Sequence, residues 1–458
     1  MTERLLVIGG DAAGMSAASQ ARKRRGRDDL EIVAFERGDF TSYSACGIPY
    51  LVGDVVDDPA KLISRTPEVF RSDFDIDVRM RHEVVEIDLD RRALKVRDLA
   101  AATESWEGFD QLVLGLGSVP MRPPIPGADA RGIHGVQTLG DGIALRDRLV
   151  SDPGVRRVVV VGGGYIGLEM AEAMVTRGLE VTLVDRSTVP LGIFDEDMSR
   201  LVADALTGLG VQLVMGHGVD AFEVDADNHV TAVVAGDHVI PTDLVVLGLG
   251  VKPNVAMVQA AGVPLGPSGG IAVDQQMRTQ VDGVWAAGDC VESFHRVSRK
   301  PVVVALGTHA NKQGRTVGVN IGGGYATFPG VIGTAVTKVC SLEIARTGVS
   351  SREATDAGFE FVSVVVDSTT RAGYFPGAAP ITTKLIAEKR SGRLLGAQII
   401  GQEGAAKRID VLATALWHEM TVDAMLNLDL SYAPPFSPVW DPVLIAARKA
   451  WEAVEADS

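Results

Sequence analysis

Cysteine is scarce in this chain of 458 residues, with single cysteines at positions 46, 290 and 340. No two of them form a Cys-x-x-Cys pair, and none has the histidine or cysteine spacing that is typical of a metal site. A disulfide framework is therefore not expected, and a reducing cytoplasm is the expected compartment.

Long apolar runs and positive charge are in short supply as well. No run reaches the roughly 20 residues that a membrane-spanning helix needs, and the N-terminus leads straight into an apolar strand without a signal-peptide pattern. The 44 basic and 59 acidic residues give a formal net charge of −15, which argues against a general role on nucleic acid or membrane surfaces. An anionic ligand must be held by local features, such as helix N-termini or basic clusters.

Glycine, in contrast, is abundant. The 51 glycines bunch in short runs between segments rich in Val, Ile and Leu, which indicates tight strand-to-helix turns rather than low complexity. The length of the chain predicts about three domains.

Two segments begin in the same way. Residues 4–8 and 157–161 are short apolar runs, each followed by glycines, a helix of small residues and a second apolar strand, which ends in Glu36 or Asp185. Strand, glycine turn, helix, strand and acid form the βαβ unit that binds a dinucleotide. We therefore predict an α/β fold with two Rossmann-like units.

The second unit carries the full glycine fingerprint, Gly162, Gly164 and Gly167. The first glycine makes the turn, the second lets the backbone approach a pyrophosphate, and the third lets helix and strand pack closely. Asp185 favours NADH because a carboxylate would repel a 2′-phosphate, although Arg186 beside it could relax this preference.

The first unit departs from this pattern. Its turn has Gly9, Gly10 and Gly14, but Asp11 stands where the second glycine is expected. The surrounding strand and helix, and the acid Glu36, still favour a nucleotide site.

Two further segments, 110–120 and 243–254, resemble each other, since each is an apolar strand that ends at a glycine-rich turn and a proline. They suggest a first dinucleotide domain at 1–120 and 250–325, with the second inserted at 121–249. After residue 325 the pattern changes to strands at 361–368, 382–388 and 394–401, a helix from about Gly404 to Glu419, and a proline-rich tail. This order is typical of a separate α+β domain, here residues 326–458.

Residues 279–290, TQVDGVWAAGDC, resemble the second flavin motif of the pyridine nucleotide-disulfide oxidoreductases, in which the aspartate, here Asp289, bonds the ribityl–phosphate region of the flavin. The two glycine turns and THANKQGR at 308–315 extend the resemblance over nearly the whole chain. It implies FAD on the first domain, NADH or NADPH on the second, and a homodimer formed through the C-terminal domain. It also implies that Tyr165 moves aside for the nicotinamide and that Glu169 faces the nicotinamide pocket.

Residues 42–50, SYSACGIPY, resemble the S-x-x-x-C-G-x-P-Y signature of the single-cysteine coenzyme A disulfide reductase branch. With no resolving partner, Cys46 must cycle between a thiolate and either a mixed disulfide with the substrate or a sulfenic acid. Because the thiolate is the reactive form, we expect the site to lower the pKa of this thiol, for instance through a helix N-terminus near Cys46.

The resemblance also implies that two C-terminal tyrosines, Tyr374 and Tyr432, reach the active site of the other subunit. A phenol near Cys46 could protonate or hydrogen-bond a departing thiolate. The predicted catalytic residues are thus Cys46, Tyr432 and Tyr374.

The remaining predicted site residues bind cofactor or substrate. The cofactor set is Gly9, Gly10, Ala13, Gly14, Glu36, Arg37, Ser42, Val84, Gly117, Asp289, Gly162, Gly164, Tyr165, Ile166, Gly167, Glu169, Asp185, Arg186 and Gly250. The substrate set is Gln20, Arg22, Lys23 and Ser42. The basic run at 22–27 could bind CoA phosphates, or it could simply complement the dipole at a solvated helix C-terminus.

Several functions stay open at this point. The branch often has Asn before the cysteine, where this chain has Ala45, and a basic residue where this chain has Phe74, with Arg71 close by. CoA disulfide, CoA persulfide or polysulfide, and another small disulfide are all candidate substrates. The alternatives are an NADH oxidase or peroxidase, which typically has histidine where this chain has Ala12, and a flavin redox sensor or electron-transfer protein.

Overall fold

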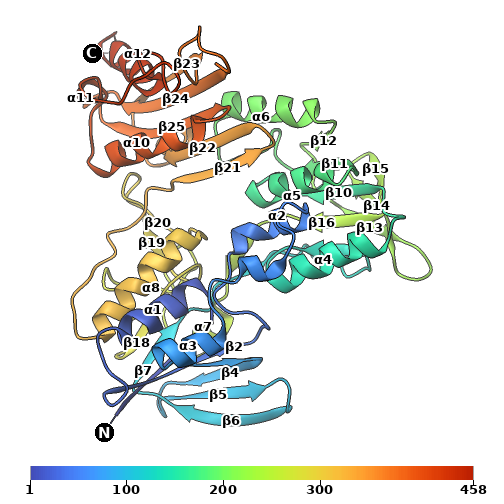
Figure 1. The fold of residues 1–458 in the computed structure, drawn as a ribbon, viewed down its shortest axis with the longest axis vertical. Helices are drawn as coiled ribbons and strands as arrows, with labels where there is room; N and C mark the ends of the chain where they lie inside the picture. Colours follow the sequence, from blue (N-terminus) through green and yellow to red (C-terminus); the bar gives the residue numbers. More distant parts are fainter. Residues whose placement is uncertain (1, 457–458) are drawn as a thin grey trace.

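A parallel sheet forms the lower part of the protein in Figure 1, in a computed structural model that describes residues 2–456. Its strands run in the order β18-β7-β1-β2-β3. They are β1 (Glu3–Ile8), β2 (Leu30–Glu36), β3 (Asp77–Met80), β7 (Gln111–Leu114) and β18 (Val284–Ala286). The apolar run in β1 is completely buried at Leu5, Leu6 and Val7, as expected of a central strand that is covered on both faces.

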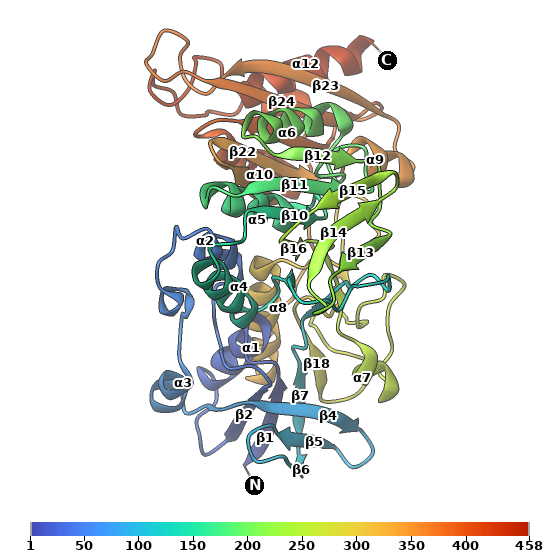
Figure 2. The ribbon, with the colours of Figure 1, turned by 90° about the vertical axis from the view of Figure 1, so that its right-hand side faces the viewer.

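Helices and a second sheet cover this parallel sheet. An antiparallel sheet contributes to the same core, and it consists of β4 (His82–Asp88), β5 (Ala93–Asp98) and β6 (Thr103–Gly108). Helices α1 (Ala12–Arg22) and α8 (Gly307–Ile321) lie side by side (Figures 1 and 2). They approach closely because α8 has glycines at the contact: a Cβ at Gly314 would lie 2.2 Å from the carbonyl oxygen of Ala13.

A second parallel sheet occupies the middle of the protein, with strand order β12-β11-β10-β16-β9. Its strands are β9 (Ile133–Gly135), β10 (Arg157–Val161), β11 (Glu180–Asp185), β12 (Gln212–Met215) and β16 (Leu244–Leu247). The helices are α4 (Leu139–Ser151), α5 (Tyr165–Thr176) and α6 (Glu196–Gly208), and a small antiparallel sheet is formed by β13 (Ala221–Val224), β14 (Val230–Ala235) and β15 (His238–Pro241).

Two antiparallel strands join the lower and middle units. They are β8 (Ser118–Pro120) and β17 (Val251–Pro253), which pair with each other where the chain leaves and re-enters the lower unit. These strands lie in the two segments whose sequences resemble each other. The remaining short elements are a 3-10 turn at Ala45–Gly47, α2 (Ile48–Val52), a 3-10 turn at Pro59–Leu62, α3 (Pro67–Phe74), α7 (Ala256–Ala260), β19 (Ser293–Phe294) and β20 (Pro301–Val302).

An antiparallel sheet with strand order β21-β22-β25-β24-β23 forms the upper unit. Its strands are β21 (Ala335–Val339), β22 (Leu342–Gly348), β23 (Phe361–Thr369), β24 (Pro380–Glu388) and β25 (Leu394–Gly401). The helices are α9 (Ser351–Asp356), α10 (Ala405–Trp417), α11 (Val422–Met425) and α12 (Pro442–Ala456). Sequence analysis missed β21 and β22, because Lys338 and Arg346 interrupt their apolar pattern. Both side chains contact the middle unit, at Glu172 and at the carbonyl of Ile193.

The sheets lie within the predicted domain ranges, whereas the boundaries themselves stay a prediction. The two ends of the chain lie at opposite ends of the long axis (Figure 2). Among residues 2–456, no helix is both long enough and apolar enough to cross a membrane.

A buried ion cluster fastens the upper unit to the middle one. Lys384 on β24 lies 3.0 Å from Asp195 and 2.7 Å from Asp197, at the start of α6. The side chains of Lys384 and Asp195 are only 8% and 9% exposed. Ser351, at the start of α9, donates its backbone N–H and its hydroxyl to Asp195 at 2.9 and 2.8 Å.

This cluster generates a stability prediction. Lys384→Met leaves Asp195 buried without its cation, which should lower the free energy of unfolding by about 3–5 kcal/mol. The control is Lys407→Met, which removes the exposed pair with Asp410 and should cost at most about 1 kcal/mol. Urea denaturation of both variants measures the difference, and equal losses would contradict the assigned role of the cluster.

Candidate active site

The first glycine turn lies between β1 and α1. Gly9 has a φ of +104°, and a Cβ at Gly14 would lie 2.0 Å from the carbonyl oxygen of Gly9, so a larger residue at position 14 would force helix and strand apart. Glu36, at the end of β2, accepts the N–H groups of Gly10 at 2.9 Å and Gly38 at 2.7 Å. The acid therefore holds its own turn in place.

The second turn repeats this geometry between β10 and α5. Gly162 has a φ of +107°, and a Cβ at Gly167 would lie 1.8 Å from the carbonyl oxygen of Gly162. Asp185 accepts the N–H of Gly163 at 2.5 Å and that of Ser187 at 2.7 Å. A Cβ at Gly164 would meet no atom within 4 Å, so the backbone at the start of α5 is open to a ligand. This space and the N-terminus of α5 fit the pyrophosphate of a dinucleotide.

The departure at Asp11 has a simple structural reason. Asp11 is the residue before α1 and has φ −117° and ψ −157°, an extended conformation that any residue adopts. A glycine is therefore not needed there for backbone conformation. Burial, and after it the Glu36 carboxylate, raises the pKa of Asp11 to about 6.

Further predicted cofactor residues surround the first turn. Ser42 donates its N–H to the carbonyl of Gly10 at 3.0 Å. Asp289 accepts a hydrogen bond from the Ser118 hydroxyl at 3.2 Å, and burial raises the pKa of its carboxyl. Gly117 has a φ of +64° with open space around its Cα. The open backbone at Gly117 and the carboxylate of Asp289 fit a bound flavin dinucleotide.

The rest of the predicted cofactor set lies on several elements of the lower and middle units. Ala13 is buried in α1, Arg37 is exposed after β2, Val84 is buried in β4, Ile166 is exposed at the start of α5, Arg186 follows β11, and Gly250 lies at the start of β17.

Cys46 lies in the 3-10 turn just before α2, and its side chain is exposed. Although α2 follows β2 in the chain, it packs against α4 and α5 of the middle unit (Figure 1). The contact is close, since a Cβ at Gly142 of α4 would lie 2.5 Å from Ile48. Arg177, just after α5, donates to the carbonyl of Val52 at the other end of α2. The cysteine is thereby held at the junction of the two dinucleotide units.

The electrostatics of Cys46 differ from the expected ones. Desolvation, and after it the Glu169 carboxylate, raises the pKa of the thiol. The helix that follows has only five residues, and its N-terminus does not offset these effects. The predicted lowering of the Cys46 pKa is therefore wrong for these protein groups, which raise it.

Glu169 and Tyr165 lie on the first turns of α5. Glu169 accepts the Thr337 hydroxyl of β21 at 2.9 Å, and burial raises the pKa of its carboxyl. The hydroxyl of Tyr165 is buried and has no hydrogen-bond partner among the described residues. The next residue of β21, Lys338, binds Glu172 at 2.6 Å, and its Nζ lies 5.6 Å from the centroid of the Tyr50 ring. These contacts, which sequence analysis missed, bring the upper unit to the active site.

The two C-terminal tyrosines lie together in loops of the upper unit. Tyr374 is 78% exposed and Tyr432 is 46% exposed. Desolvation, and after it the nearby Tyr374 phenol, raises the pKa of Tyr432. Tyr374 lies between β23 and β24, which stand above the middle unit that α2 packs against (Figure 1).

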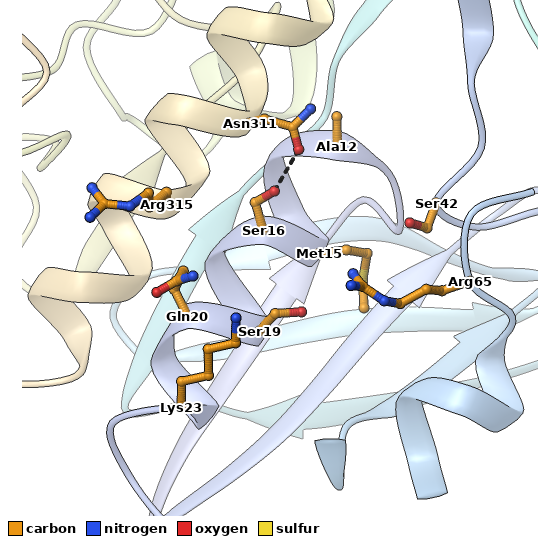
Figure 3. Close-up of a pocket in the computed structure, with 10 residues that line it drawn as sticks. All are labelled: Ala12, Met15, Ser16, Ser19, Gln20, Lys23, Ser42, Arg65, Asn311 and Arg315. Atoms are coloured by element: carbon orange, nitrogen blue, oxygen red, sulfur yellow. Dashed lines mark hydrogen bonds between the residues drawn. The ribbon is translucent and has the colours of Figure 1, made fainter. Parts of the chain in front are cut away.

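A cavity of about 260 Å³ opens along α1 (Figure 3). Its lining residues are Ala12, Met15, Ser16, Ser19, Gln20, Lys23, Ser42, Arg65, Asn311 and Arg315. The predicted substrate residues Gln20, Lys23 and Ser42 are among them. Arg65 and Arg315 line the cavity as well, but they were not among the residues predicted from the sequence, although Arg315 ends the motif THANKQGR at 308–315.

Arg22 is placed differently from its prediction and does not line the cavity. Its guanidinium donates to the carbonyls of Phe74 at 3.1 Å and Asp75 at 3.0 Å, and it is 10% exposed. These hydrogen bonds satisfy two carbonyl groups at the C-terminal end of α3.

Residues 3–314 match the pyridine nucleotide-disulphide oxidoreductase family, and residues 334–442 match its dimerisation domain. The chain is 36% identical over 448 residues to the NAD(P)H sulfur oxidoreductase (CoA-dependent) of Pyrococcus abyssi, and the match covers 97% of each chain. It is 33% identical to the NADH oxidase of Methanocaldococcus jannaschii, with 98% of each chain covered. The solved NAD-dependent persulfide reductase from A. fulgidus matches with a TM-score of 0.95 at 38% identity, over 99% of this chain and 84% of that one.

The Glu169 carboxylate generates a prediction about Cys46. Glu169→Gln removes a negative charge that disfavours the thiolate, so alkylation of Cys46 by iodoacetamide should reach its half-maximal rate at a lower pH. Peptide mass mapping separates Cys46 from Cys290 and Cys340. Glu196→Gln serves as a control with an unchanged profile, because that carboxylate is exposed on α6 and does not act on Cys46. An unchanged or upward shift in Glu169→Gln would refute this coupling.

Proposed function

The chain belongs to the pyridine nucleotide-disulphide oxidoreductase family, and from this premise we propose that it reduces a small disulfide or persulfide of the CoA type. Electrons come from NAD(P)H and would pass through FAD to the mixed disulfide that a single redox-active cysteine, Cys46, forms with the substrate. The reducing cytoplasm is the compartment that suits an unpaired catalytic thiol.

One observation carries this proposal: the cavity along α1 gathers positive charge in an acidic protein. Lys23, Arg65 and Arg315 line it, and among the described residues none of the three has a carboxylate within ion-pair distance. The chain as a whole has a formal charge of −15, so three unpaired cations on one cavity favour an anionic ligand. The phosphates of a CoA-type substrate have this charge.

One wall of this cavity belongs to the segment that carries Cys46. Ser42 lies on its wall, and Cys46 follows four positions later in the chain. A substrate that binds its phosphates at the three cations can therefore extend its sulfur toward Cys46. The cavity favours this substrate over dioxygen or peroxide, because neither of these needs cations for binding.

The chemistry at Cys46 is thiol–disulfide exchange. The Cys46 thiolate attacks one sulfur of the substrate disulfide, a mixed disulfide with Cys46 forms, the substrate S–S bond breaks, and the departing thiolate takes up a proton. When bound, FAD supplies two-electron transfer from NAD(P)H to sulfur. Gly162, Gly164 and Gly167 would hold the nicotinamide dinucleotide, with Tyr165 as the gate of its pocket.

We assign proton donation to Tyr432, assisted by Tyr374, in the active site of the partner subunit. The exposed loops of the upper unit support this assignment, because Phe436, Val439 and Trp440 near Tyr432 are 75%, 70% and 51% exposed. Exposed apolar side chains in such number are typical of an interface. A phenol that loses solvent there can protonate the leaving thiolate.

The relative named NADH oxidase supports a second candidate function, in which a Cys46 sulfenic acid forms during reduction of dioxygen or peroxide. Ala12, which lines the cavity, offers no acid or base for that chemistry.

The direct test is Cys46→Ser in the holoenzyme. This variant should lose disulfide-dependent oxidation of NADH, by at least about 1,000-fold, because no other described cysteine is exposed. Reduction of the flavin by NADH should continue, and its bleaching near 450 nm in stopped flow measures this step. Unchanged disulfide turnover would refute the proposal, and Cys340→Ser is the control that should retain activity.

A further inference from the structure

Position 74 carries an aromatic ring beside the candidate substrate cavity. Phe74 is the last residue of α3, and it packs against the core of the lower unit. A neighbouring cation on this helix, Arg71, does not take part in the cavity, because it pairs with Asp77 at 3.5 Å and its side chain is 59% exposed. Arg71 therefore contributes no charge to the cavity, and the cation that lines it at this end comes from the segment before α3.

Arg65, just before α3, supplies that charge. Its Cζ lies 5.2 Å from the centroid of the Phe74 ring and 6.0 Å from that of Phe70. In Figure 3 the guanidinium extends over the cavity beside Met15. Phe74 thus offers a face on which a guanidinium from the preceding loop stacks.

The loop that carries Arg65 is tied down on both sides. Ser64 donates its N–H to the carbonyl of Ser42 at 2.8 Å, which fastens the loop to the cavity wall. Thr66 caps α3 by accepting the N–H of Val69 at 3.4 Å. A stacked guanidinium on an anchored loop loses little further freedom on binding, and its planar donors match two phosphate oxygens.

A second, independent observation points to a polar ligand in the same cavity. Ser19 is 8% exposed, and its hydroxyl has no hydrogen-bond partner among the described residues. It lines the cavity together with Lys23, one turn later on α1. A buried hydroxyl without a partner is costly unless a ligand or water satisfies it.

We propose that Arg65, positioned by its stacking on Phe74, is the residue that selects substrates with a phosphorylated end. Ser19 and Lys23 complete this phosphate subsite. The inference deepens the proposed function, because it rests on the same cavity but assigns selectivity to a residue outside the basic run of α1.

The kinetic test compares two substrates in the holoenzyme, CoA disulfide and pantethine disulfide, which has the same reactive sulfurs and no nucleotide phosphates. Arg65→Gln should raise KM for CoA disulfide about tenfold or more, leave kcat little changed, and leave both constants for pantethine disulfide unchanged. Arg71→Gln is the matched control without effect. Equal losses for both substrates, or no loss for CoA disulfide, would overturn the assignment.

The positioning role of Phe74 has its own readout. Phe74→Leu should raise KM for CoA disulfide by less than Arg65→Gln does, because the guanidinium remains but loses its stacking face. Phe74→Lys in the Arg65→Gln background should recover affinity by returning a cation to this place. A failure of both variants to change KM would show that Phe74 does not position Arg65.

Binding of dethio-CoA, measured by calorimetry on the holoenzyme, separates this inference from the proposed function. A tenfold weaker affinity in Arg65→Gln supports the subsite even if wild-type enzyme does not reduce CoA disulfide, in which case only the proposed function fails. Equal affinity of wild type and Arg65→Gln overturns the subsite, even if Cys46 still reduces disulfides.

Discussion

The packing of α2 against α4 and α5 is the contact on which the active site depends. The segment that carries Cys46 belongs by sequence to the lower unit, yet its helix lies on the middle unit, with Gly142 and Gly53 leaving room for the approach. Arg177 and Arg146 also bind the end of α2, through Val52 and Asp54, and so fasten the helix that follows Cys46 to the middle unit.

The upper unit restrains this same junction. Its first strand, β21, reaches α5 through Thr337 and Lys338, and the cluster around Lys384 fixes α6. The unit therefore contributes more than a surface for association. Through Thr337 it also binds Glu169, the carboxylate whose charge acts on Cys46.

The cavity along α1 is lined by positive charge, whereas the protein as a whole is negatively charged. The protein carries an excess of carboxylates, but Lys23, Arg65 and Arg315 stand unpaired around one cavity in the described chain. Local cations raise the concentration of an anionic substrate where the average field would repel it. In the proposed function, the cations of the cavity would select the substrate, whereas desolvation and Glu169 act on the Cys46 thiol.

Much of this arrangement could be predicted from the sequence. The glycine turns and their acids follow from fixed spacing, and the structure shows why: each third glycine meets a carbonyl oxygen, and Glu36 and Asp185 bind their own turns. Arg22 and Arg65 could not be assigned in this way, because their orientation depends on neighbours in space. Arg22 binds carbonyl groups at the end of α3, whereas Arg65 stacks on the ring of Phe74 and lines the cavity. The strands β21 and β22 were missed because their polar residues serve contacts with α5 and the loop before α6.

The central claim is that Cys46 alternates between a thiolate and a mixed disulfide with a phosphorylated thiol. Intact-mass analysis of the oxidised holoenzyme, before and after addition of NADH, tests it most directly. We predict an adduct of CoA mass on Cys46 that NADH removes. A dimedone-trapped oxygen adduct, or a thiol that stays unmodified through turnover, would contradict the account.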